Sequence, residues 1–281
     1  MLAEWETNTV LIADHLRKRY PEMVRQLESI FTEHQIPLIA VSGLADIWIR
    51  DAAPVQVDDR RFTQFCYRPD YLRKNHRHLI TRPAVFRKLE FVGRPTKSQL
   101  IIDGGNIVGT GSVAVLTDKV LKENPRWNRN ELSENLRKLL QVENVFFVPR
   151  EPYDYVGHTD AMLRFLTYEQ VILNDYSLNE PRFAERLEKV LTANGIRFTR
   201  IPYMPEHKVR DGIPSAVGNY ANYLRVENLV VVPAYELPED EIARGILANL
   251  LPQCCVVSLP CRDLAEQGGV INCATWTIRR P

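Results

Sequence analysis

Five short polar motifs recur along the chain, each at the head of an apolar, strand-like run. They hold Asp51 in WIRDAAP, Asp103 in DGGN, His158 and Asp160 in GHTD, Asn222 in NYANY and Cys273 in GGVINC. Steps of 52, 55, 64 and 51 residues separate the motifs, a spacing that indicates one supersecondary unit used several times. Because each unit carries a reactive residue at the same relative place, we expect the units to converge on one centre. A Cys, a His and carboxylates gathered there are typical of an enzyme.

Between the motifs, short apolar strands alternate with amphipathic helices. The pattern predicts hairpins over 48–67, 99–117, 157–175 and 219–235, a last strand over 268–278, and helices over 21–34, 130–140, 181–194 and 238–251. No Ser/Gly-rich linker interrupts the series, so the sequence predicts a single α/β domain over residues 1–281. Such units cannot bury their apolar faces alone, and five of them closing on themselves give a five-bladed α/β propeller with its helices outside.

The composition excludes several other classes of protein. The net charge of +1 provides no field for nucleic acid or an anionic membrane, and we interpret the basic stretch 73–87 as a solvated surface. The N-terminal residues lack a signal-peptide pattern, and no apolar run approaches the ~18 residues of a membrane helix. Five cysteines at irregular spacing favour a reducing compartment, hence a cytoplasmic location. We expect the strand cysteines Cys254, Cys255 and Cys261 to be buried thiols rather than ligands of a metal. Oligomeric state leaves no signal in the sequence.

The ordered motifs resemble those of the agmatine deiminases and the Porphyromonas-type peptidylarginine deiminases, in the guanidino-group-modifying superfamily. The resemblance runs over nearly the whole chain, from AEW at the start through DIWIRDAAP, DGGN, GHTD and NYANYL to GGVINC. It implies the same propeller (the pentein fold), a hydrolase without a cofactor, and a small guanidino substrate. Two positions depart from the family pattern: Ala53 replaces the usual Gly before Pro54, and Asn272 replaces the usual His before Cys273. The chain is also shorter than typical agmatine deiminases, and we interpret it as a shorter subfamily whose preferred substrate can differ.

Guanidino chemistry explains the proposed catalytic residues. A guanidinium carbon is a poor electrophile because its charge is delocalised, and a thiolate from Cys273 supplies the strong nucleophile that it needs. The alternative for Cys273 is a buried strand thiol. On a predicted strand, His158 and Asp160 share one face, and His158 can protonate departing ammonia and then activate water. The alternative for His158 is a core histidine satisfied by Asp160.

The remaining polar residues are predicted to bind the substrate or to orient His158. Asp51 and Asp160 suit a bidentate clamp on a planar guanidinium, although Asp51 could instead pair with its neighbour Arg50. The resemblance implies that Asp103 orients the histidine, whereas the sequence alone also allows a turn cap. Two further candidates for substrate binding, each also compatible with a purely structural role, are Asn222 in the pocket wall and Trp48 over the guanidinium face.

The predicted activity is hydrolytic deimination through a cysteine thiouronium intermediate, with agmatine converted to N-carbamoylputrescine and ammonia. Alternatives are deimination of protein-bound or free arginine, amidino transfer to an amine, and a catalytically silent propeller that binds a cation. The set Cys273, His158, Asp51 and Asp160 argues against silence, since a binder has no use for a thiolate beside a His. Candidates for holding a substrate carboxylate are Arg164, Arg210 and Arg225.

Overall fold

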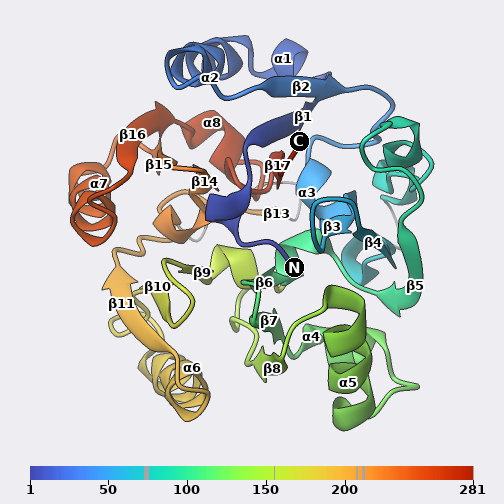
Figure 1. Ribbon diagram of the computed structural model, residues 1–281. Helices are drawn as coiled ribbons and strands as arrows, with labels where there is room; N and C mark the ends of the chain where they lie inside the picture. The colour runs from blue at the N-terminus through green and yellow to red at the C-terminus, as the bar shows by residue number, and fades with distance from the viewer. Residues whose placement is uncertain (73–75, 155, 207, 211–212, 281) are drawn as a thin grey trace.

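The computed structural model describes residues 1–72, 76–154, 156–206, 208–210 and 213–280. Five three-stranded sheets stand in a ring around a central axis (Figure 1). In each sheet the middle strand pairs antiparallel with one neighbour and parallel with the other. This arrangement confirms the predicted five-bladed α/β propeller. The blades are β3 (Val55–Gln56), β4 (Phe62–Cys66) and β5 (Thr96–Ile101); β6 (Val108–Gly109), β7 (Val113–Thr117) and β8 (Asn144–Val148); β9 (Leu163–Phe165), β10 (Gln170–Asn174) and β11 (Arg197–Ile201); β14 (Leu224–Val226), β15 (Leu229–Ala234) and β16 (Cys255–Pro260); and β17 (Thr275–Ile278), β1 (Thr9–Ala13) and β2 (Leu38–Val41).

Four amphipathic helices cover the outer rim of the ring (Figure 1). They are α2 (Pro21–Glu33), α5 (Arg129–Leu140), α6 (Pro181–Ala193) and α7 (Glu239–Leu250), close to the predicted ranges. In α6, for example, Phe183, Leu187 and Leu191 recur at every fourth position and are all buried against the blades. Shorter helical segments in the connections are α1 (Leu16–Arg19), α4 (Lys119–Glu123) and α8 (Arg262–Ala265), and a two-stranded ribbon pairs β12 (Val209–Arg210) with β13 (Ile213–Pro214). Within the described residues, no helix is long and apolar enough to cross a membrane.

The blade formed by β3, β4 and β5 has no long helix in its crossover. Three one-turn segments take that place: η2 (Asp70–Leu72), η3 (Arg77–Leu79) and η4 (Phe86–Lys88). The predicted basic surface lies in this crossover, and its charged side chains outside 73–75 are exposed, as expected for a solvated stretch. Residues 73–75 lie outside the described part of the chain.

One prediction about buried thiols is wrong. Cys261 is buried and Cys254 is half-buried, but Cys255 is exposed. The reason is that β16 is the outer edge strand of its sheet (Figure 1), and most of its side chains are exposed or half-buried, whereas β14 at the other edge is buried throughout.

The N-terminal segment crosses one end of the central axis (Figure 1). Its short helix η1 (Glu4–Glu6) places Glu4 in an ion pair with the fully buried Arg164, whose Nη1 also donates to the carbonyl of Tyr223 at 2.6 Å. Arg225 stacks over the ring of Trp5 and donates to the carbonyl of Leu166 at 3.0 Å. Two candidate partners for a substrate carboxylate, Arg164 and Arg225, are therefore held by contacts within the fold. The side chain of Arg210 lies outside the described part.

The two ends of the chain share one sheet. β1 pairs antiparallel with β17, from Thr9 opposite Ile278, and parallel with β2, from Val10 opposite Leu38. The first and last blade-forming strands thereby close the ring.

Candidate active site

The five polar motifs form single helical turns that lead into the inner strands. These turns are α3 (Ile49–Ala52), η5 (Gly104–Asn106), η6 (Thr159–Ala161), η7 (Tyr220–Asn222) and the turn 271–274 before β17. Backbone bonds three residues apart close them, as from the Asn106 amide to the Asp103 carbonyl at 3.0 Å. The predicted strand over 268–278 is therefore wrong at its start, because β17 begins at Thr275. The face-sharing argument for His158 and Asp160 is wrong for the same reason: η6, not a strand, positions them.

His158 lies between two carboxylates. Its Nε2 is 2.9 Å from Oδ2 of Asp103, and its Nδ1 is 3.5 Å from Oδ1 of Asp51. Burial favours the neutral ring, but the charges of Asp51 and Asp103 outweigh it and raise the pKa of His158 to about 9. Burial, together with repulsion from Asp103 and Asp160, raises the pKa of Asp51 to about 7. His158 is thus an imidazolium at neutral pH.

Arg50 does not neutralise its neighbour Asp51. The Nε of Arg50 donates to the carbonyl of Asn272 at 2.7 Å, and Oδ1 of Asp51 accepts from the amide of Gly105 at 3.2 Å. α3 thus directs Arg50 to the backbone beside Cys273 and Asp51 to the imidazole.

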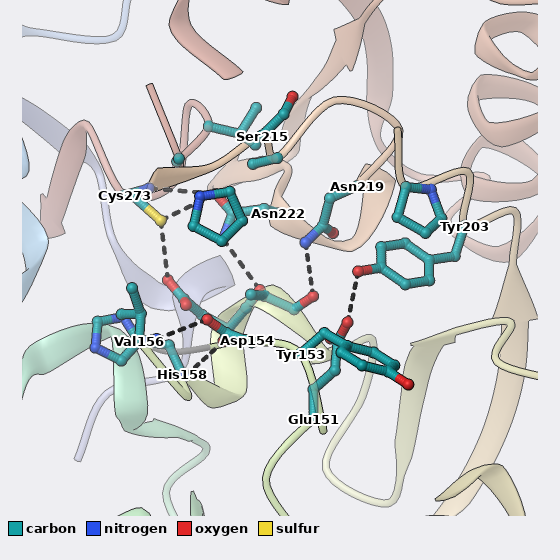
Figure 2. Close-up of a pocket in the computed structure, with 18 of the residues that line it drawn as sticks. Glu151, Tyr153, Asp154, Val156, His158, Tyr203, Ser215, Asn219, Asn222 and Cys273 are labelled. Atoms are coloured by element: carbon teal, nitrogen blue, oxygen red, sulfur yellow. Dashed lines mark hydrogen bonds between the residues drawn. The ribbon is translucent and has the colours of Figure 1, made fainter. Parts of the chain in front are cut away.

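Cys273 lies beside an amide and a carboxylate from two other blades. Its Sγ is 3.3 Å from Oδ1 of Asn222 and 3.8 Å from Oδ2 of Asp160 (Figure 2). Burial, followed by the charges of Asp160 and Asp51, raises the pKa of the Cys273 thiol well above its usual range. The sulfur is therefore a protonated thiol at neutral pH.

Asp160 retains one unused oxygen. Oδ2 accepts a hydrogen bond of 2.7 Å from the Nδ2 of Asn272, whereas the buried Oδ1 has no hydrogen-bond partner among the residues that the structure describes. Asn272, which departs from the family pattern, thus orients this carboxylate. The unpaired oxygen is available to an N–H donor entering the site.

Two cavities meet at Cys273 and His158. The first, of about 470 Å³, is also lined by Asp160 and Asn222 and extends to the acidic side chains Glu151, Asp154 and Glu180 (Figure 2). The second, of about 490 Å³, is lined by Asp51 together with Trp48 and other polar and aromatic side chains. Among the described residues that line the two cavities, none is a Lys or an Arg.

Glu151 is a buried carboxylate in the wall of the first cavity. Tyr176 and Tyr203 donate their hydroxyl groups to its two oxygens at 2.8 and 2.7 Å. Burial and the nearby charge of Asp154 raise the pKa of Glu151 to about 7. Figure 2 shows Glu151 and Tyr203 away from Cys273, across the cavity. The carboxylate has hydroxyl partners but forms no ion pair among the described residues.

The structure therefore brings six predicted site residues into one centre: Asp51, Asp103, His158, Asp160, Asn222 and Cys273. The side chain of Asn222 makes hydrogen bonds at both of its ends. Its Oδ1 accepts from the Cys273 thiol, and its Nδ2 donates to the backbone carbonyl of Asp160 at 3.1 Å. Trp48 lies in the second cavity with its ring against Gly269. Sequence reasoning missed Lys119, Gly105 and Glu151. Gly105 belongs to the DGGN motif, but nothing in the motif shows how closely it approaches His158 and Asp51; no motif marks Lys119 or Glu151, and only their positions in space connect them to the site. Lys119 in particular reads as an ordinary residue at the start of a short helix.

Comparison with known proteins places the chain in a family. The sequence model of the Porphyromonas-type peptidyl-arginine deiminases matches residues 1–278. The agmatine deiminase of Pseudomonas putida is 27% identical over 207 residues, covering 62% of this chain and 56% of that protein, and that of Ectopseudomonas mendocina is 28% identical over 206 residues with the same coverage. The matched region thus spans little more than half the length of these relatives. The structure of C. jejuni agmatine deiminase shares the fold, with a TM-score of 0.80 at 17% identity over 100% of this chain and 95% of that one. Because the family model matches the chain almost from end to end, this protein belongs to the Porphyromonas-type peptidyl-arginine deiminase family.

Proposed function

We propose that the protein hydrolyses a guanidino group to a ureido group with release of ammonia, and that its substrate is agmatine, which yields N-carbamoylputrescine. One observation carries the proposal: the sulfur of Cys273 lies 3.8 Å from Asp160, a carboxylate with an unpaired buried oxygen, at the junction of the cavities that His158 also lines. This junction therefore combines three groups: Cys273 as a nucleophile, Asp160 as an acceptor for a planar cation, and His158 as a proton donor.

Substrate binding follows from the charges of the site. The site has three carboxyl groups around the imidazolium of His158, from Asp51, Asp103 and Asp160. Because these groups are buried, their negative charge costs free energy that a bound cation would offset. A guanidinium donates N–H groups to carboxylates in a planar, bidentate geometry, so Asp51 and Asp160 would hold its carbon near the sulfur. Its positive charge also lowers the pKa of both Asp51 and Cys273, so that the thiolate forms when the substrate is present. In this proposal Asn222 lines the pocket wall and Trp48 covers the guanidinium face.

The chemistry then proceeds in two halves. The Cys273 thiolate forms a C–S bond to the guanidinium carbon, and protonated His158 gives its proton to the departing ammonia. The neutral imidazole next takes a proton from a water molecule that attacks the thiouronium carbon, and the C–S bond breaks to release the urea product. Asp103 holds His158 through Nε2 throughout.

The acidic first cavity supports an amine-ended substrate. Glu151, Asp154 and Glu180 favour an ammonium group there and oppose the carboxylate of free arginine. A side-by-side assay of agmatine, free arginine and an arginyl peptide for ureido product tests this choice, and we expect agmatine to have the highest kcat/KM. Addition of glycine or ornithine separates hydrolysis from amidino transfer, because transfer yields an amidino product. Binding of agmatine without any turnover would instead indicate a silent propeller.

Glu151→Gln is expected to raise the KM for agmatine at least ~10-fold with little change in kcat. The ammonium of the substrate loses its charge partner, while the glutamine amide can still pair with both tyrosine hydroxyls by accepting from one and donating to the other. The measurement is steady-state kinetics above pH 7, where Glu151 is ionised. Butylguanidine, which lacks the amine, is the matched control and should be turned over equally by both proteins. An equal loss for both substrates would show that Glu151 supports the fold rather than reading the amine.

Gly105→Ala is expected to reduce kcat/KM ~100-fold or more. A Cβ at Gly105 would lie 2.7 Å from Nδ1 of His158 and 2.8 Å from Oδ1 of Asp51, so the two side chains must separate. Gly111→Ala is the control, since nothing lies within 4 Å of its Cβ position. Thermal unfolding of both variants distinguishes a displaced site from a damaged fold, and wild-type kinetics in Gly105→Ala would contradict the proposed geometry.

The proposal treats residues 1–281 as one catalytic domain that acts on a small guanidino molecule. It requires no cofactor for the steps above. A cytoplasmic location stays a prediction from the sequence.

A further inference from the structure

One buried cation beside the site has no part in the reaction described so far. Lys119 opens α4 and is 1% exposed. Its Nζ is 2.7 Å from Oδ2 of Asp103, the same oxygen that His158 contacts through Nε2 at 2.9 Å. Because both cations contact the same carboxylate oxygen, a change in the charge of one changes the pKa of the other.

Two more carboxylates hold the Lys119 ammonium in this place. Oε2 of Glu123, one helical turn along α4, is 3.3 Å from Nζ, and Oδ1 of Asp70 is 3.8 Å away. Burial opposes the charge on Lys119, but Asp103 and Glu123 outweigh it and raise the pKa of the amine. Burying an ammonium group away from water costs free energy. Lys119 is nevertheless buried next to Asp103, the carboxylate that contacts the proposed proton donor His158.

Lys119 acts on Asp103 and His158 in different ways. Burial raises the pKa of Asp103, but the charges of Lys119 and His158 outweigh it, so the carboxyl stays ionised. The same ammonium repels a protonated His158 and so opposes the effect of Asp51 and Asp103 on the ring. The titratable groups around this pair are Asp51 from α3, Asp70 and Tyr71 from η2, Asp103 before η5, Glu123 from α4, Asp160 from η6 and Cys273 from the turn 271–274.

We propose that Lys119 is a positioning residue that fixes Asp103 against His158 and limits how tightly His158 holds its proton. The role in turnover rests on the deimination proposed above, in which His158 must release a proton in the first half and accept one in the second. An imidazolium that is too stable slows the first transfer and leaves too little neutral ring to complete the cycle. Lys119 thereby keeps the histidine usable in both directions without touching the substrate.

Direct titration of His158 tests this role. The titration is followed by NMR in protein with labelled histidine rings. Lys119→Met should move the titration midpoint of His158 upward by ~1 pH unit, because the nearby positive charge is lost. Glu123→Gln should move the midpoint downward, because a nearby negative charge is lost. The signal is assigned by its disappearance in His158→Gln. Lys138→Met, which breaks an exposed pair with Glu134 in α5, is the matched control and should leave the midpoint unchanged.

The kinetics should follow the titration. We expect the basic limb of the kcat/KM profile to move in opposite directions in Lys119→Met and Glu123→Gln, and kcat to fall ~10-fold or more in Lys119→Met with KM within ~3-fold of wild type. A purely structural role would impair both variants without opposite shifts of the midpoint.

Unchanged midpoints, or shifts of both variants in the same direction, would overturn the proposal. Should Lys119→Met fail to fold, the downward shift in Glu123→Gln decides alone. The NMR titration needs no turnover, so opposite shifts in a protein that releases no ureido product would refute the proposed function and leave the electrostatic coupling standing.

Discussion

Replacement of Cys273 by alanine is expected to abolish the proposed deimination, with kcat lowered at least ~1000-fold and the fold unchanged. No other described residue offers a thiol at the junction of the two cavities, and removal of an essential nucleophile typically costs several orders of magnitude. The substitution removes one sulfur atom of a half-buried side chain that lines the cavities, so the thermal midpoint should stay close to that of the wild type. Ureido formation from agmatine, followed over hours at high enzyme concentration, gives the required sensitivity.

A second cysteine supplies the control for this experiment. Cys255 is exposed on the edge strand β16, and Cys255→Ala should keep wild-type kinetics. Residual activity of Cys273→Ala above about 1% of wild type, with contamination excluded by mass spectrometry, would refute the assignment of Cys273 as the nucleophile.

Asp160→Asn is expected to act in opposite directions on turnover and on thiol reactivity. Turnover should fall ~100- to 10,000-fold, because the guanidinium loses a charged acceptor and its carbon is no longer held near the sulfur. The thiol pKa should fall as well. Burial is the main cause of its elevation and remains, but the charge of Asp160, the next largest cause, is gone. More thiolate is then present at a given pH, so neutral iodoacetamide should alkylate the substrate-free variant faster than the wild type.

The paired readouts separate an electrostatic effect from damage to the site. Asp263→Asn, at an exposed carboxylate in α8, should change neither rate. If Asp160→Asn slows both turnover and alkylation, the substitution has displaced Cys273, and Asp160 then supports the site without binding the substrate charge.

The sequence predicts the ring because each blade repeats the same pattern. The apolar strands and the fourfold spacing of Phe183, Leu187 and Leu191 mark their elements without any knowledge of their neighbours. The same repeat explains why the polar motifs could be placed at one centre before their local conformation was known.

Local conformation at the motifs was harder to predict. A polar residue followed by an apolar run is compatible with two local structures. The strand can begin at the polar residue, or a single helical turn can precede the strand; the structure has the helical turn. The contact between Lys119 and Asp103 could not be predicted from the sequence. The two residues are 16 positions apart, and only the folding of the intervening strands β6 and β7 brings them together. Similarly, nothing in the run CCVVSLPC distinguishes an edge strand from a covered one, so the exposure of Cys255 depends on the order of strands in the sheet.

The closing sheet has a consequence for the order of assembly during synthesis. β1 leaves the ribosome more than 260 residues before its antiparallel partner β17, so β1 must wait with one edge unpaired. The turn that aims Cys273 directly precedes β17, and its sulfur meets Asn222 and Asp160 only when that strand docks. The proposed nucleophile is therefore the last part of the reactive centre to be installed. An unfinished chain can contain every other polar residue of the site and still be chemically inert.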